Sequence, residues 1–135
     1  MPGKGAPGAQ AEPRPPRAAP PKVLYALDAA LTSLSPVADV GPLTAHATAA
    51  VQVGRGNVLD VSHVIFPNGA ITLVLILAES HLSIHTWPEE NLIAIDLFSC
   101  GAIDGPKVLG ELVRLLALES VRVRQLARGA QADRG

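Results

Sequence analysis

The residues best suited to chemistry in this chain are gathered in one segment, Glu79 to Glu89, which reads Glu-Ser-His-Leu-Ser-Ile-His-Thr-Trp-Pro-Glu. The residues directly before it, 71–78, are almost all apolar. An apolar run of this length is too short to span a membrane and predicts a buried strand. Because the end of a buried strand holds polar groups rigidly, the segment is the best candidate for an active site.

Three familiar interpretations fit these side chains: a zinc site, a hydrolase site and a purely structural role. His81, His85 and Cys100, with Asp96 as a fourth ligand, are suitable types for zinc, although their spacing matches no common zinc pattern. A serine nucleophile with a histidine base describes a hydrolase, but the Gly-x-Ser-x-Gly elbow is missing. When each residue is considered alone, the simplest interpretation is structural: each histidine is a hydrogen-bonded group in the core, and the cysteine is a small buried apolar residue.

The fourth interpretation is cleavage of the backbone at the Glu79-Ser80 junction. A serine hydroxyl attacks the preceding carbonyl to form an ester, elimination releases the upstream chain, and hydrolysis leaves a pyruvoyl group at the new N-terminus. This chemistry requires a constrained serine, a base for its Cα proton and donors for the oxyanion. Ser80 offers the hydroxyl, His85 offers the base, and Thr72 or Ser83 offers a second hydroxyl.

The apolar pattern predicts an α+β fold, a two-layer sandwich with a mostly antiparallel sheet and two helices on one face. The turn signal Pro67-Asn68-Gly69 predicts a hairpin. Because the run 71–78 is apolar toward both faces, we expect the sheets of two copies to pack together in a dimer. Strands are expected at 22–28, 58–66, 71–78, 92–99 and 121–125, and helices from Ser35-Pro36 to Gly54, interrupted at Pro42, and from Asp104-Gly105-Pro106.

Length and composition predict a single domain with an aliphatic core. The chain has 135 residues, a net charge of −1 and only 3% aromatic residues, so there is no electrostatic basis for binding nucleic acid or an anionic membrane. One cysteine rules out an internal disulfide, and the N-terminus lacks a signal-peptide pattern, so we expect a cytoplasmic protein. We predict a disordered Pro/Ala/Gly-rich tail at 1–22, a domain at 23–127 and a polar tail at 128–135.

The motif Ala78-Glu-Ser-His-Leu-Ser-Ile-His-Thr-Trp-Pro-Glu89, followed by Ala94-Ile-Asp-Leu-Phe-Ser-Cys-Gly101, resembles the signature of the S-adenosylmethionine decarboxylase proenzymes of the short bacterial and archaeal class. The resemblance covers residues 57–127 well. It implies cleavage between Glu79 and Ser80, which yields a β chain (1–79) and an α chain (80–135). Ser80 then becomes a pyruvoyl group that forms a Schiff base with the substrate amine.

The resemblance also implies roles for other side chains. His85 matches the proton acceptor in processing, Cys100 matches the proton donor in catalysis, and Thr72 stands where the family usually has a serine. The implied enzyme is a homodimeric carboxy-lyase that uses neither pyridoxal phosphate nor a metal. Its product, decarboxylated S-adenosylmethionine, donates aminopropyl groups in spermidine biosynthesis.

Departures from the family pattern concern the substrate more than the mechanism. Lys22-Val23-Leu24 replaces a stretch that usually carries a histidine, and Glu90-Asn91-Leu92 replaces a Tyr-Gly-Tyr-like stretch. Phe66 and Glu89 are the candidate substrate contacts. The alternatives are a pyruvoyl decarboxylase of the same lineage acting on arginine or ornithine, whose cationic side chain Glu89, Glu90 or Asp60 would hold, and a non-catalytic homologue.

Overall fold

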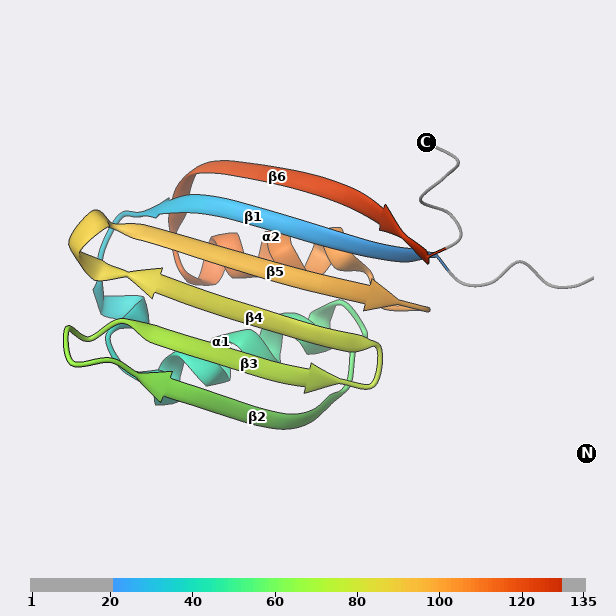
Figure 1. Ribbon diagram of the computed structural model, residues 1–135, viewed down its shortest axis with the longest axis horizontal. Coiled ribbons are helices and arrows are strands. Elements are labelled where there is room, and N and C mark those ends of the chain that lie inside the picture. The colour runs from blue at the N-terminus through green and yellow to red at the C-terminus, as the bar shows by residue number, and fades with distance from the viewer. Residues whose placement is uncertain (1–20, 130–135) are drawn as a thin grey trace, which may run out of the picture.

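The described part of the chain forms a six-stranded sheet with two helices on one face (Figure 1). This computed structural model describes residues 21–129, so most of the predicted N-terminal tail and residues 130–135 lie outside the described part. The strands are β1 (Lys22–Leu31), β2 (Val58–Ile65), β3 (Ile71–Leu77), β4 (Ser80–Trp87), β5 (Leu92–Cys100) and β6 (Leu118–Arg128); the helices are α1 (Val40–Val53) and α2 (Gly105–Leu115), with short 3-10 turns η2 (Ser35–Val37) and η3 (Pro88–Glu90).

The strands lie in the order β2-β3-β4-β5-β1-β6, and every neighbouring pair is antiparallel. Helices α1 and α2 both cover the same face (Figure 1). Side chains alternate between the two faces of a strand, so one apolar set from each central strand meets the helices. The core is aliphatic as predicted, and its fully buried side chains include Leu73, Leu75, Leu82, Ile84, Ile93, Ile95, Leu97, Leu43, Val51, Val108 and Leu112. The α+β prediction is confirmed.

The segment expected to follow a buried strand is itself a strand, β4, paired with β3 on one side and β5 on the other. Leu82, Ile84 and Thr86 are buried on the helix side, and the Thr86 hydroxyl accepts a hydrogen bond from the backbone N–H of Ile71 at 2.9 Å. The intervening His81 and His85 therefore belong to the face without helices. The prediction of five strands was wrong because this alternation, which is typical of a strand, was interpreted only as a reactive segment.

The first helix begins later than predicted. Ser35 and Pro36 form the short turn η2, and α1 starts at Val40 with Asp39 before it. Pro42 does not interrupt the helix, because it occupies the first turn, where backbone N–H groups have no partner inside the helix. The second helix starts as predicted, with the Asp104 carboxylate accepting a hydrogen bond from the N–H of Lys107 at 3.1 Å.

The predicted hairpin joins β2 and β3. The N–H of Phe66 donates to the carbonyl of Ala70 at 2.8 Å, and Gly69 has a φ of 89°, which a residue without a side chain adopts readily. The strand predicted to reach Phe66 ends one residue earlier, and the final strand is longer than predicted because its pairing with β1 extends to Leu118 and Arg128.

The face of the sheet opposite the helices, called the open face below, is not covered by any other element within residues 21–129. Its apolar members include Val64, Ile76 and Leu126, which are 53%, 46% and 56% exposed, together with the partly buried Leu24, Val74 and Phe98. The apolar run in β3 thus has one face in the core and one facing outward. The predicted packing of this face against a second copy stays a prediction.

Candidate active site

His85 and Thr72 form a direct pair on the open face. The two residues are register partners on β4 and β3, and Thr72 Oγ1 lies 3.2 Å from His85 Nδ1. When Nδ1–H donates to the threonine oxygen, Nε2 is left with a free lone pair. The pair therefore orients an imidazole so that its far nitrogen can accept a proton.

This pair borders a cavity of about 410 Å³. The cavity lies next to the β2–β3 turn, where β3 begins and β4 ends. The cavity places both predicted substrate contacts, Phe66 and Glu89, beside His85. The other lining residues are Asn68, Ala70, Thr72, Thr86 and Trp87. Trp87 is 37% exposed and its ring centroid lies 6.3 Å from that of His85, so two aromatic side chains and a carboxylate surround the histidine. Trp87 is not among the substrate contacts predicted from the sequence, because nothing near it in the sequence indicates that its ring lies beside His85.

Ser80 lies at the opposite end of β4 and has an unusual backbone. Ala78 and Glu79 form the turn between β3 and β4, and Ser80 pairs with Leu77 to close it. Ser80 has a φ of 140°, which residues with a side chain rarely adopt. Such a conformation costs about 1–3 kcal/mol and persists only where surrounding contacts hold it. The strain falls on the residue predicted to attack its own peptide bond.

Cys100 lies at the Ser80 end of the sheet. Ser80 pairs across β4 and β5 with Ser99, the immediate neighbour of Cys100. Cys100 is partly buried, and its side chain is on the same face as that of Phe98, two residues earlier in β5. The guanidinium of Arg128 sits 5.5 Å from the centre of the Phe98 ring, so an aromatic and a cation flank the thiol's end of the open face.

The predicted site residues thus form two groups within one chain. Thr72 and His85 are at one end of β4, and Ser80 with Cys100 is at the other. His85 is five positions after Ser80 along β4, which corresponds to about 16 Å between their Cα atoms. No imidazole can reach across that distance, so His85 does not contact the Ser80 of its own chain.

The same distances also test the zinc-site and hydrolase interpretations. His81 and His85 are four positions apart on one strand, about 13 Å, and among residues 21–129 no three His, Cys, Asp or Glu side chains converge as metal ligands do. A hydrolase in which His85 activates Ser80 within one chain is excluded by their separation, because nucleophile and base must lie within hydrogen-bond reach.

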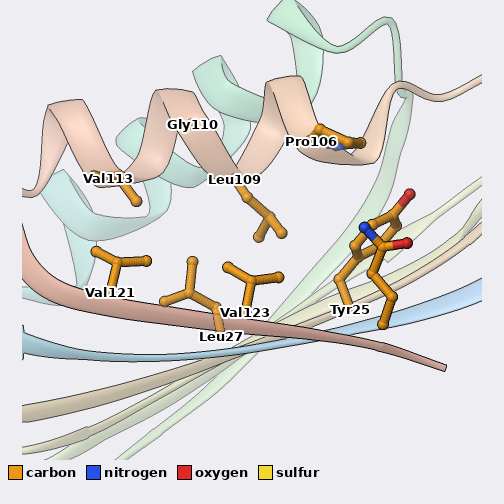
Figure 2. A pocket seen from close by; sticks show the side chains of 9 residues that line it. Tyr25, Leu27, Pro106, Leu109, Gly110, Val113, Val121 and Val123 are labelled. Atoms are coloured by element: carbon orange, nitrogen blue, oxygen red, sulfur yellow. The ribbon is translucent and has the colours of Figure 1, made fainter.

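A second cavity, of about 390 Å³, lies on the helix side of the sheet, between α2 and the strands β1 and β6 (Figure 2). Leu109 and Val113 of the helix face Leu27, Val121 and Val123 of the sheet across it. Its walls hold no histidine, cysteine, serine or acid, and the sheet separates it from His85. It does not have the groups that the chemistry above requires.

Gly110 lies in α2 at the edge of this cavity, and a Cβ added there meets no atom within 4 Å. Glycine in the middle of a helix costs about 0.5–1 kcal/mol relative to alanine. We predict that Gly110→Ala raises the free energy of unfolding by about that amount. Urea unfolding at equal protein concentration measures it, with Gly56→Ala as a control that should be destabilising, since its Cβ would lie 2.6 Å from Ile103 Cδ1.

The α+β fold and the motif together indicate a small decarboxylase, and comparison with known proteins makes the assignment specific. The family model for S-adenosylmethionine decarboxylase matches residues 25–129, and the chain belongs to that family. It is 37% identical over 92 residues to an S-adenosylmethionine decarboxylase proenzyme 2 of Bacillus cereus, covering 67% of this chain and 75% of the relative. It is 36% identical over 110 residues to the proenzyme of Picrophilus torridus, covering 80% of each chain.

A solved structure supports the fold independently. The adenosylmethionine decarboxylase of Aquifex aeolicus matches with a TM-score of 0.74 and 23% identity, over 83% of this chain and 93% of that one. Neither helix within residues 21–129 has the length and apolar character needed to cross a bilayer.

Proposed function

We propose that this protein is a self-processing enzyme that decarboxylates S-adenosylmethionine, and so supplies the aminopropyl donor for polyamine synthesis. Membership of the family supports the activity. The observation that carries the proposal for this chain is the positive φ of Ser80 within the Glu79-Ser80 motif. A strained serine after a tight turn is what an attack on the preceding carbonyl needs.

In processing, the Ser80 hydroxyl replaces the Ser80 nitrogen on the carbonyl carbon of Glu79, and the hydroxyl proton moves to that nitrogen. A base then removes the Ser80 Cα proton, and the bond between Cβ and the ester oxygen breaks. Addition of water and loss of ammonia leave the pyruvoyl group. Relief of the strain at Ser80 favours the first step, since the acyl shift frees the backbone at that residue.

The pyruvoyl group supplies an electrophilic carbonyl that condenses with the substrate amine and withdraws electrons from its Cα. The residues at the Ser80 end of the sheet fit this group, because Cys100 adjoins the strand partner of Ser80. The Cys100 thiol donates the proton that replaces carbon dioxide on the substrate Cα. No metal is needed for any of these steps.

Two copies of the chain complete the site in this proposal. A base must come close to Ser80, and His85 of the same chain lies about 16 Å away along β4. If two open faces pack with their β4 strands running in opposite directions, the Ser80 end of one copy meets the cavity of the other. Packed sheets lie about 10 Å apart, which side chains from both faces span. The exposed Val64, Ile76 and Leu126 give this face the apolar surface that such packing buries.

In that arrangement the substrate is held by both copies. Its amine and carboxylate lie beside Ser80 and Cys100 of one chain, and its remaining part enters the cavity lined by Phe66, Trp87 and Glu89 of the other. An aromatic side chain that stacks on the purine ring contributes about 0.5–1.5 kcal/mol to binding beyond the burial of its surface. A carboxylate is also suited to the hydroxyls of a ribose.

Replacing Cys100 with alanine is predicted to leave chain cleavage intact and to lower decarboxylation by about 100- to 10,000-fold, the usual contribution of a positioned acid. Without the Cys100 thiol, the proton would be delivered to the carbon of the pyruvoyl group instead of the substrate Cα, and this transamination would inactivate the group. Carbon dioxide release and the intact mass of the α chain after turnover measure both effects. Normal turnover in Cys100→Ala would remove this role.

The test of the proposed function is carbon dioxide release from S-adenosylmethionine, arginine and ornithine, compared side by side on the processed protein. Release from S-adenosylmethionine alone is expected. The alternative, a decarboxylase for a cationic amino acid, is favoured by one observation, the carboxylate of Glu89 in the cavity. Release from arginine or ornithine only would establish that alternative, and no release from any of the three would reject both.

A further inference from the structure

We propose that Asn57 is a positioning residue for self-cleavage, acting through the side chain of Glu79; this inference rests on the proposed function. Asn57 lies in the loop between α1 and β2, 22 positions before Glu79. Its backbone N–H donates to Glu79 Oε1 at 3.0 Å, and its side-chain Nδ2 donates to Glu79 Oε2 at 2.9 Å. Its carbonyl accepts a hydrogen bond from the N–H of Ala78 at 2.9 Å. We call these three contacts the Asn57 clamp.

The clamp holds the residue whose carbonyl carbon is attacked. Both carboxylate oxygens of Glu79 are occupied, so the side chain cannot rotate without breaking a hydrogen bond to an ionised group, the stronger kind. On the other side of the scissile bond, Ser80 is fixed by pairing with Leu77 and Ser99. The peptide between Glu79 and Ser80 is therefore restrained from both directions, and the positive φ of Ser80 is the backbone distortion at that point.

The loop that carries Asn57 is itself anchored to the core. The carbonyl of Gly54 accepts a hydrogen bond from Asp104 at 2.9 Å, and the N–H of Gly56 donates to Val51 at 2.8 Å. A Cβ at Gly56 would lie 2.7 Å from Val51 Cγ1, so the backbone there packs directly on helix α1. A rigid support of this kind can maintain strain at Ser80, whereas a loose loop would relax with it.

The clamp bears on the acyl shift, the step in which the bond from Ser80 Oγ to the carbonyl carbon of Glu79 forms and the bond from that carbon to the Ser80 nitrogen breaks. The hydroxyl proton moves to the nitrogen, so no other reactant is required. Holding the Glu79 carbonyl against the Ser80 hydroxyl keeps the attacking and attacked atoms together. Later elimination and hydrolysis take place on the Ser80 side and do not depend on the clamp.

The experiment follows cleavage of newly made full-length chain in cell-free synthesis, by intact mass against time. Asn57→Ala is expected to slow cleavage at least tenfold. Asn57→Asp should slow it further, because two carboxylates then face each other. The double variant Asn57→Asp with Glu79→Gln exchanges the amide and the carboxylate. The amide at position 79 can then donate to the carboxylate at position 57, and its oxygen can still accept from the backbone N–H of position 57. The double variant should cleave within about threefold of wild type, which a general loss of folding cannot explain.

Thr32→Val is the matched control, because it removes another exposed side-chain hydrogen bond between segments distant in sequence, from Thr32 Oγ1 to the carbonyl of Ala117 at 2.8 Å. It should cleave at the wild-type rate. Hydroxylamine, which cuts esters, separates the steps: it should not restore cutting in Asn57→Ala if the acyl shift is slowed. Far-UV circular dichroism and urea midpoints show that each variant is folded.

Three results would overturn the role of Asn57: cleavage of Asn57→Ala at the wild-type rate, a double variant as slow as Asn57→Asp, or full recovery with hydroxylamine. None of these three results contradicts the proposed function, provided that the wild-type chain is cut between Glu79 and Ser80. A wild-type chain that stays whole instead rejects the proposed function itself, so the two failures are distinguishable.

Discussion

Replacing Ser80 with alanine is expected to leave one uncut chain of 135 residues, where wild type yields fragments of 79 and 56 residues. Alanine has no hydroxyl to attack the Glu79 carbonyl, so no ester forms and the effect is complete rather than partial. Decarboxylation should be lost as well, because the electrophilic carbonyl comes from the same side chain. Intact-mass analysis of the purified variant measures the first effect, and carbon dioxide release the second.

The control for this change is Ser62→Ala, which removes a serine on β2, a strand that does not carry the cleavage site. That variant should be cut like wild type, with an α chain whose N-terminus is blocked to Edman degradation. The hypothesis fails if wild type is recovered as a single species with an unmodified Ser80. It also fails if Ser80→Ala is cut between positions 79 and 80.

The layers of the fold were predictable because they depend on local apolar patterns. The stripe on α2 and the apolar run in β3 are periodic, and Asp104-Gly105-Pro106 is a strong helix start. The late start of α1 was not predictable from the same rules. Ser35-Pro36 has the composition of a helix start, yet it begins a separate turn, and the backbone changes direction before Val40.

The site was predictable in its residue types and not in its geometry. Ser80, His85 and Cys100 stand at fixed positions in a recognisable motif, but their distances depend on strand register. Register is set by the two-residue turn at Ala78 and Glu79 and by pairing with β5 across the short connection 88–91, and residue types alone do not fix either pairing. Asn57 could not be found at all, because nothing near it in the sequence indicates that its partner is Glu79.

The separation of Ser80 from His85 leads to a prediction for mixed dimers. Ser80→Ala and His85→Ala are each expected to abolish or strongly slow cleavage when made alone. Made together in one cell, they should form dimers in which one site combines the intact Ser80 of one chain with the intact His85 of the other. In that site the chain carrying His85→Ala should be cut at close to the wild-type rate, while the chain carrying Ser80→Ala stays whole.

Differently tagged chains and intact-mass analysis distinguish the two products, and separate expression followed by mixing of purified dimers is the control for exchange. The result expected is cleavage confined to the chain carrying His85→Ala, in up to half of the copies of that chain when the two chains mix statistically. Absence of cleavage in verified mixed dimers would show that His85 serves its own chain. Since the two residues lie about 16 Å apart in the uncut chain, that outcome would require strand β4 to leave its place between β3 and β5 before the peptide breaks.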